Sequence, residues 1–409
     1  MPEEVWRHAP LADLITLEYG GALPASMRRD GPLPVVGSNG EVGRHSEALV
    51  KGPGIVIGRK GTVGAVNWVE PDFWPIDTTY WVRSKGPHLR WLFWILARSG
   101  LNRLDSSTGV PGLNRGDAYR LVLPIPPKEE QRAIAAILDS AAEATRTTEQ
   151  LLPKLAQLRQ GMLVTLLTHG LDDAGRIRDP DQNPHEFRDS PLGRIPRGWQ
   201  ALTVEDLLAD VEPAMRSGPF GSALLKAELV DAGIPLLGID NVHVERFIDR
   251  YTRFVRPAKA KELSRYRVRP RDVMITIMGT VGRSCVVPDD IGEALSSKHT
   301  WTISFDQSKI SPELACLQFN YAPWVLRHFR RDEQGGIMSA IRAETLRTTL
   351  LPVPPPEEAE RIEHVLASAS ARLRQEAALL DKLRLLKAGL SADLLEGRVR
   401  STSHAEGAA

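Results

Sequence analysis

The sequence predicts a mixed α/β protein built from two similar modules, each followed by a long helix. Three observations predict it: a duplicated proline-rich tract, a regular apolar stripe after each copy, and strand-like runs in the same order before each copy. The tract LPIPPKEEQ begins at Leu123 and returns as LPVPPPEEA at Leu351, an offset of 351 − 123 = 228 residues. A chain of 409 residues is also longer than one core usually organises.

The duplication extends upstream of the proline tract. GTVG occupies residues 61–64 and 279–282, an offset of 218, and Trp6 corresponds to Trp199 with an offset of 193. The second copy is therefore longer by 228 − 193 = 35 residues. We expect these extra residues in loops, because the entropy of closing a loop grows only slowly with its length.

A helix is expected after each proline tract. Proline suits the first turn, where amide donors have no partner within the helix, and Glu129 with Glu130 place carboxylates at the positive end of the helix dipole. An alternating three- and four-residue spacing predicts that the two helices pair as an antiparallel coiled coil. Its expected interface consists of Ile134, Leu138, Ala141, Leu152, Leu155, Met162, Leu166, Ile362, Leu366, Ala369, Leu373, Leu380, Leu383, Leu390 and Leu394.

Three positions interrupt this pattern. Arg159 and Lys387 place cations in the stripe, and the neighbouring Leu158 and Leu386 are expected to continue the apolar face, as a period nearer 3.6 would require. Pro153 should bend the first helix near Glu149 without breaking it. Forty residues at about 1.5 Å each make a rod of about 60 Å. The alternative is that both helices are core elements of two ordinary domains.

These patterns divide the chain into six segments. Strands are expected around GIVIG, TTYWVR, DVMITIM and HTWTISF, and helices over HLRWLFWILARSG and PELACLQFNYAPWVLRHF. The expected boundaries are a first module at 1–126, a spacer helix at 127–168, a linker at 169–190, a second module at 191–354, a second spacer helix at 355–396 and a flexible tail at 397–409.

Composition limits the class of protein. Lys plus Arg total 52 against 51 acids, so the net charge does not indicate a nucleic-acid partner. The sequence has neither an apolar run of about 18 residues nor a secretory leader, so no membrane association is expected and a cytoplasmic location is the default. The two cysteines, Cys285 and Cys316, are too few for a disulfide framework and are expected to be buried.

Catalytic motifs are missing from the sequence. It contains no Walker loop, no G-x-G-x-x-G, no H-E-x-x-H, no Glu-x-Lys tract and no two histidines within five residues of each other. The tract NPHEF around Asn183 is not the Asn-Pro-Pro-aromatic tract of amino-methyltransferases. We therefore expect a chain that is not an enzyme and that holds no metal and no cofactor.

The duplicated L-P-x-P-P-x-E-E start, the GTVG tract and the PLGRIPRGWQ opening of the second module resemble the specificity subunit of Type I restriction-modification enzymes. The resemblance runs from Trp6 to about Leu395, although the first module lacks an IPxGW lead-in. It implies two target-recognition domains that each read half of a split site on double-stranded DNA. It also implies a coiled-coil spacer that docks two modification (methyltransferase) subunits.

The resemblance assigns the cofactors to other chains. It implies S-adenosylmethionine on the partner modification subunits, and ATP and Mg on partner restriction subunits that act as translocase and nuclease. Two other classes stay open: a single-chain restriction-methylation enzyme, which would need catalytic tracts here, and a coiled-coil scaffold that binds only protein, which would fit the near-neutral charge.

Base readers should be polar loop residues, with cations nearby for phosphates. The pairs Arg59–Lys60 and Lys298–His299 are favoured, while a turn-forming or solvated role remains the alternative for each candidate. The candidates are Asn39, Arg59, Lys60, Thr62, Thr78, Asn114 and Arg115 in the first module and Arg216, Ser217, Asn241, Thr280, Lys298, His299, Ser339 and Arg342 in the second.

Overall fold

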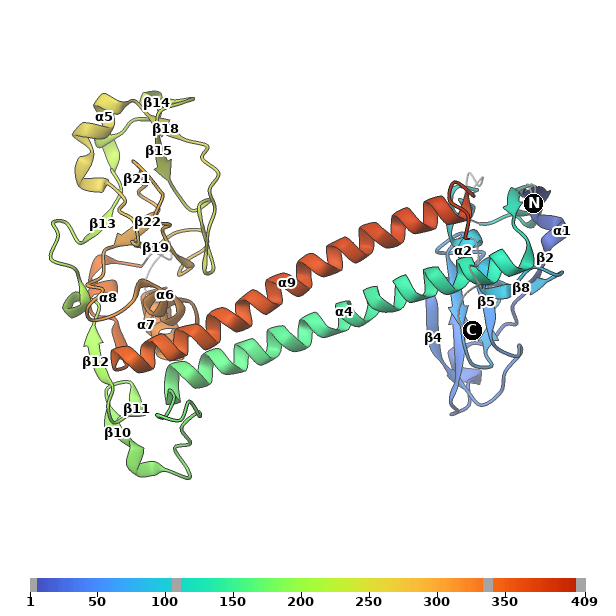
Figure 1. Ribbon diagram of the computed structural model, residues 1–409, viewed down its shortest axis with the longest axis horizontal. Helices are drawn as coiled ribbons and strands as arrows, with labels where there is room; N and C mark the ends of the chain where they lie inside the picture. Colours follow the sequence, from blue (N-terminus) through green and yellow to red (C-terminus); the bar gives the residue numbers. More distant parts are fainter. Residues whose placement is uncertain (1–5, 105–111, 334–340, 402–409) are drawn as a thin grey trace, which may run out of the picture. The chain divides into compact units, whose positions relative to one another are not determined.

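A computed structural model describes residues 6–104, 112–333 and 341–401, and the chain divides into two compact units (Figure 1). Unit 1 comprises residues 1–151 and 376–409, and unit 2 comprises residues 152–375. Each unit therefore contains one module and part of each long helix, α4 (Lys128–His169) and α9 (Pro356–Leu395). The predicted mixed α/β class with two long helices in contact is confirmed.

Unit 1 is built around a four-stranded antiparallel sheet. Its central strand β5 is buried at every residue, as the apolar tract GIVIG predicts. The sheet order is β2 (Ile15–Tyr19), β8 (Thr79–Ser84), β5 (Gly54–Gly58) and β6 (Val66–Val69). The remaining elements are β1 (Arg7–Pro10) paired with β9 (Val122–Ile125), β3 (Leu33–Gly37) paired with β4 (Gly40–His45) and β7 (Trp74–Pro75), and helices α1 (Leu11–Leu14), α2 (Leu89–Arg98) and α3 (Arg115–Tyr119).

Unit 2 contains two four-stranded sheets. Their orders are β13 (Met215–Ser217), β22 (Thr300–Ile303), β19 (Val273–Thr276), β20 (Ser284–Val286), and β14 (Leu229–Val230), β18 (Phe254–Val255), β15 (Ile234–Leu237), β21 (Leu295–Ser296). The other strand pairs are β10 (Phe187–Ser190) with β11 (Gly193–Pro196), β12 (Gln200–Thr203) with β23 (Leu350–Val353) and β16 (Val242–His243) with β17 (Arg246–Phe247). The helices of the module are α5 (Pro257–Glu262), α6 (Pro312–Tyr321), α7 (Pro323–Glu333) and α8 (Ala343–Arg347).

The two modules share one topology, so the repeat in the sequence is a repeat in the fold. The sheet β13-β22-β19-β20 has the chain order of β2-β8-β5-β6, and the parallel pair β15–β21 matches β3–β7. Both GTVG tracts close equivalent turns. Gly61 and Gly64 have φ of +78° and +71°, and Gly279 and Gly282 have φ of +75° and +86°, values that favour glycine.

One expected helix of the second module is two helices. α6 ends at Tyr321 and α7 begins at Pro323, with Ala322 between them in an extended conformation. Pro323 has no amide hydrogen and disfavours helical geometry in the preceding residue, yet it fits the first position of a new helix. The prediction of one continuous helix over PELACLQFNYAPWVLRHF is therefore wrong at this point. In contrast, α4 continues through Pro153, so the expectation that this proline would not break the helix is confirmed.

The long helices pack in antiparallel sense. In unit 1, Ile134 and Leu138 near the start of α4 share a core with Leu394 at the end of α9. In unit 2, Leu166 near the end of α4 shares a core with Ile362 near the start of α9. The other predicted interface residues are half-buried, except for buried Leu366 and Leu380: Ala141, Leu152, Leu155, Met162, Ala369, Leu373, Leu383 and Leu390.

The alternating three- and four-residue spacing of the helix interface continues through positions that are occupied by polar residues. Thr145 is buried and donates to the carbonyl of Ala141 at 2.7 Å, which satisfies its hydroxyl within the helix. Leu158 and Leu386 are 64% and 54% exposed, so the prediction that they continue the apolar face is wrong. The interface follows a seven-residue repeat rather than drifting toward 3.6 residues per turn.

Arg159 stays in this interface because unit 2 supplies partners for its charge. Its Nε donates to Ser370 Oγ on α9 at 2.7 Å, and its Nη2 lies 2.6 Å from both carboxylate oxygens of Glu245. Tyr321 of α6 donates to the same carboxylate. The Arg159 guanidinium therefore connects α4 and α9 to the module of unit 2.

A buried glutamate in the first turn of each long helix is held by the segment that follows the other long helix. Glu130, 8% exposed, accepts from Trp6 Nε1 at 2.9 Å and from Arg400 Nε and Nη2 at 2.8 Å each. Glu358, 4% exposed, accepts from the amide of Leu171 at 2.9 Å and from Arg178 at 2.5 and 3.2 Å. The two carboxylates occupy equivalent positions, since 358 − 130 = 228.

The segment after α9 packs on unit 1. Gly397 has φ of +71°, and a Cβ there would lie 3.1 Å from the Trp6 ring. Glu396 accepts from Arg98 at 2.7 Å, and Arg400 pairs with Glu130 as described above. Residues 397–401, the first part of the tail expected at 397–409, therefore begin with long-range contacts to Trp6 and Glu130.

Two further expectations from the sequence concern burial and membranes. Cys285 and Cys316 are buried, as predicted, and burial raises the pKa of the Cys316 thiol to about 12. Throughout the described ranges, none of the helices combines the length and the apolar character that crossing a bilayer requires.

Replacing Glu130 by glutamine should lower the free energy of unfolding by about 2 kcal/mol, because the Arg400 guanidinium would lose its charged partner in a mostly buried place. Urea denaturation followed by tryptophan fluorescence measures the change. The adjacent Glu129 is the matched control: it is exposed and pairs with Arg132 one turn along, so Glu129→Gln should stay within about 0.5 kcal/mol of wild type. Equal losses in both variants would contradict a special role for Glu130.

The same variant should differ from wild type in a pH-dependent way. Burial alone would raise the pKa of Glu130, but hydrogen bonds from Arg400 and Trp6 outweigh it, so the pKa lies below its ordinary value. Such a carboxyl stabilises the fold fully above its unfolded pKa of about 4.3 and loses this contribution as pH falls through its lower folded value. The gap between wild type and Glu130→Gln should shrink in that acidic window, and a constant gap would show that charge is not involved.

Candidate nucleic-acid interface

Four segments distant in the sequence meet at one end of the sheet β2-β8-β5-β6. Ser38 Oγ donates to the carbonyl of Thr78 at 3.1 Å, Lys60 forms an isolated bridge with Gly112, and the amide of Leu113 donates to the carbonyl of Arg59 at 2.8 Å. These contacts bring together the segments that carry all the first-module candidates: Asn39, Arg59, Lys60, Thr62, Thr78, Asn114 and Arg115.

An exposed tyrosine lies at the centre of this surface. Tyr19, the last residue of β2, is 54% exposed, and the guanidinium carbons of Arg59 and Arg115 lie 5.2 Å and 4.3 Å from its ring centroid. Its ring is also 5.2 Å from that of Tyr80 on the neighbouring strand β8. The sequence did not single out Tyr19, since only the pairing of β2 with β8 brings it to the two arginines.

Arg59 and Arg115 are suited to binding a planar acceptor. Arg59 Nη2 donates to the carbonyl of Asp77 at 2.9 Å, which fixes the guanidinium, while its Nε is buried with no hydrogen-bond partner among the described residues. The Nε of Arg115 is likewise buried with no hydrogen-bond partner among the described residues. A guanidinium held by stacking presents donors in one plane, the geometry that binds guanine O6 and N7 or a phosphate. Lys60 beside them is exposed.

Two of the first-module candidates position their neighbours. The carbonyl of Thr78 accepts from the amides of Arg59 and Lys60 at 2.9 and 3.0 Å, which sets the course of that turn. Asn114 caps α3, because its Oδ1 accepts from the amides of Gly116 and Asp117 at 2.7 and 3.3 Å. The side chains of Asn39 and Thr62 are exposed in the turns on either side.

The second module builds an equivalent surface from different side chains. The amide of Ile277 donates to the carbonyl of His299 at 3.0 Å, which ties the second GTVG turn, with Thr280, to the Lys298–His299 segment. Trp301 Nε1 donates to the carbonyl of Ile341 at 3.0 Å, just as the Tyr80 hydroxyl donates to that of Leu113 at 3.2 Å. Lys298 and Arg342 are exposed, and Ser339 lies outside the described residues.

The surroundings of His299 favour its neutral form over the charged one. Burial lowers the pKa of its imidazole, and the nearby charges of Lys298 and Arg253 lower it further. A neutral imidazole offers one donor and one acceptor, which suits a base edge better than a phosphate. Arg253, which the sequence did not single out, is half-buried and pairs with Asp240 beside this segment.

Three second-module candidates lie in the interior and are withdrawn as DNA contacts. Arg216 is 4% exposed: its Nε donates to the carbonyl of Arg267 at 2.6 Å, and Nη2 pairs with the buried Asp272. Asn241 is buried, and its Oδ1 closes a turn by accepting a hydrogen bond from the amide of Gly238 at 3.0 Å. Ser217 is buried on β13, where it pairs with Trp301 as Tyr19 pairs with Tyr80.

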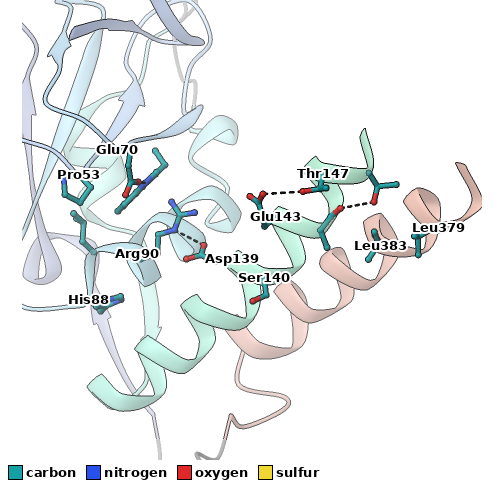
Figure 2. Close-up of a pocket in the computed structure, with 14 residues that line it drawn as sticks. Pro53, Glu70, His88, Arg90, Asp139, Ser140, Glu143, Thr147, Leu379 and Leu383 are labelled. Carbon is teal, nitrogen blue, oxygen red and sulfur yellow. Dashed lines mark hydrogen bonds and ion pairs between the residues drawn. The ribbon is translucent and has the colours of Figure 1, made fainter. Parts of the chain in front are cut away.

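A further surface of unit 1 lies between the module and the helices (Figure 2). It is an open cleft of about 1170 Å³ with Trp68 and Arg90 on the module side and with α4 and α9 residues, including Leu383, on the other. Arg90 Nε and Trp94 Nε1 both donate to Asp139 Oδ1 of α4, at 2.7 and 2.9 Å. These bonds anchor α2 on α4, and the Arg90 guanidinium stacks 4.4 Å from the Trp68 ring.

Comparison with known proteins gives one consistent family. The family model of the Type I restriction modification DNA specificity domain matches residues 3–157. The Type I restriction enzyme MjaVIII specificity subunit of Methanocaldococcus jannaschii is 21% identical over 75% of this chain and 68% of that one. The EcoBI specificity subunit of Escherichia coli is 23% identical over 75% of this chain and 65% of that one. The matched part thus spans about two thirds of these curated relatives.

A solved structure has the same fold. The S subunit of a Type I restriction-modification system from M. genitalium superposes with a TM-score of 0.60 at 16% identity, over 97% of both chains. With its repeated module topology, its two long helices in contact and these matches, the chain belongs to the specificity subunits of Type I restriction-modification systems, the non-catalytic component that gives such a complex its DNA specificity.

Proposed function

We propose that the two modules each read one half of a bipartite site on double-stranded DNA, that the α4–α9 pair sets their spacing, and that the chain docks two modification subunits. The observation that carries the proposal is a surface repeated in both modules. In each module, hydrogen bonds join the GTVG turn, the start of β8 or β22, and the residues just before the short helix α3 or α8. Methylation with S-adenosylmethionine, and cleavage with ATP and Mg, belong to partner modification and restriction subunits of a cytoplasmic complex.

The chemistry of the two surfaces supports base reading. The guanidinium groups of Arg59 and Arg115 stack on the exposed Tyr19 ring, and the exposed Lys60 beside them can reach a phosphate. In the second module, neutral His299 lies between the exposed cation Lys298 and the sheet. Sequence-specific binding needs two kinds of contact: cations that bind phosphates and position the protein on the duplex, and planar groups that distinguish one base edge from another.

The helix pair supports a fixed spacing between the half-sites. Its strict repeat and the Arg159–Ser370 bond across it oppose sliding of one helix along the other. Helices of 42 and 40 residues are each about 60 Å long, compared with about 34 to 36 Å for one turn of DNA. We therefore expect half-site centres one turn or a little more apart, because tilt shortens the projection.

Exposed leucines on the long helices support two docking sites. Leu158 of α4 and Leu386 of α9 are turned to solvent at equivalent positions of the repeat, since 386 − 158 = 228. Leu385 beside Leu386 is 75% exposed. Apolar side chains at matched positions of a repeat suit two copies of one partner.

Removing the Arg59 side chain should weaken binding to the target DNA by about 10- to 100-fold, the discrimination of one bidentate arginine contact. Adenine methylation by the assembled complex and DNA binding both measure the loss. Arg83 is the control, because it lies toward the other end of β8 and is exposed. Arg83→Ala should keep wild-type binding, and a folded Arg59→Ala complex with normal methylation would remove Arg59 from the proposed contacts.

Deleting one heptad from each helix, residues 145–151 together with 373–379, should shorten the recognised gap. Seven residues at about 1.5 Å span about 10 Å, or about three base pairs at about 3.4 Å each. Sequencing the methylated sites of cells that carry the variant complex measures the gap. A gap of unchanged length with reduced activity would refute the role of the helices as a spacer.

Introducing charge at one docking position should weaken only one of two partner sites. Leu158→Glu or Leu386→Glu alone should leave one modification subunit bound, and the double variant should lose both, with about a 10-fold or larger loss of affinity at each altered site. Native mass spectrometry of the assembled complex gives the stoichiometry. Leu49, exposed on the first module, is the control, and a full complement of subunits on the double variant would argue against this surface.

A further inference from the structure

The second module carries a basic helical insert that the first lacks. In module 1, strand β4 ends at His45, and the amide of Val50 donates to the carbonyl of Phe73. In module 2, the equivalent strand β18 ends at Val255, and the amide of Val268 donates to the carbonyl of Ala294. Residues 256–267, numbering 267 − 255 = 12, thus replace residues 46–49, numbering 49 − 45 = 4.

The insert differs from its counterpart in charge as well as in length. Residues 256–267 read RPAKAKELSRYR, with five cations and one acid, while residues 46–49 read SEAL, with one acid and no cation. The near-neutral net charge of the chain therefore conceals a local concentration of positive charge. This asymmetry lies within the part of the sequence that makes the second copy longer.

The insert is fixed to the module by its apolar side. Ala260 and Tyr266 pack on a small core that includes Leu263 of the insert and Val255 and Leu236 of the sheet. Figure 1 shows α5 beside β14 and β18, at the end of unit 2 away from that unit's parts of α4 and α9. An insert anchored in this way holds its polar side in a defined place.

Ion pairs neutralise two of the five cations. Lys259 pairs with Glu228 at 2.9 Å, and Arg267 pairs with Glu293 at 2.9 Å. The other three, Arg256, Lys261 and Arg265, are exposed and have no ion pair among the described residues. We call these three residues the insert patch.

The insert patch is connected to the surface of module 2 that carries Lys298 and His299. The Arg267 carbonyl at the end of the insert accepts from Arg216 on β13, and Arg267 bridges to Leu295 of β21. Strand β21 leads directly into Lys298 and His299. Arg253, three residues before the insert, is close enough to lower the pKa of His299.

We propose that the insert patch binds backbone phosphates of the DNA next to the half-site read by module 2, so that this half-site is held by more electrostatic contacts than the other. The inference rests on the proposed function, because it assumes that module 2 faces DNA. Three exposed cations within twelve residues provide up to three phosphate contacts, and contacts of this kind add affinity without adding base preference.

The test uses the assembled complex of this chain with its modification subunits and a long mixed-sequence duplex as the probe. Changing the insert patch together, Arg256→Gln, Lys261→Gln and Arg265→Gln, should reduce the slope of log K against log salt by about 2.7, since each phosphate contact contributes about 0.9. Binding to target and to mixed-sequence DNA should fall by the same factor. The conservative variant Arg256→Lys, Lys261→Arg and Arg265→Lys should keep the wild-type slope.

Each outcome decides between distinct claims. A wild-type slope in the glutamine variant, with wild-type specificity intact, would overturn this inference alone. A complex that fails to assemble from the glutamine variant would show that the patch binds a protein partner, and would also overturn it. A wild-type complex with no preference for any DNA sequence would instead refute the proposed function. Thermal unfolding of each variant confirms that the exposed substitutions leave the fold unchanged.

Discussion

A buried carboxylate in the first turn of each long helix is the constraint on which the architecture depends. Glu130 is held by Arg400 and Trp6, and Glu358 by Arg178 and the amide of Leu171. In both cases the arginine comes from the segment that follows the other long helix. A helix can satisfy this geometry only if it starts where its partner ends, so the two clamps impose the antiparallel arrangement that the apolar interface alone would leave open.

The interface between the helices fixes how far one antiparallel helix is shifted along the other. Apolar residues at alternating spacing favour association, but they tolerate sliding by a whole heptad. The Arg159 guanidinium removes that freedom, because Ser370 and Glu245 satisfy it in one alignment only. Burying a paired cation contributes little net stability compared with an apolar residue, so its value here is the specification of one alignment.

Sequence reasoning succeeded where the information is local or repeated. The proline tracts and the apolar spacing placed helices at 127–168 and 355–396, and the structure has them at Lys128–His169 and Pro356–Leu395. It failed where a distant residue decides: Arg216 resembled a loop cation, but Asp272, 56 positions away, takes it into the core. Tyr19 was missed for the same reason, since strand pairing alone brings it to Arg59. The division between α6 and α7 is local in origin, because Pro323 disfavours helical geometry in the residue before it.

The repeat preserves one set of residues and changes another, and the division follows function. Trp6 and Trp199, Glu130 and Glu358, and the glycines of both GTVG turns are the same in both copies, and all of them shape or anchor the fold. The reading positions differ: Tyr19 corresponds to buried Ser217 through strand pairing, and Arg59 corresponds to Ile277, since 277 − 59 = 218. If both surfaces contact DNA as proposed, different donors on one scaffold should favour different bases. Under the proposed function, the two halves of the target should therefore differ in sequence, because the shared scaffold positions both modules and the differing loops would supply the base contacts.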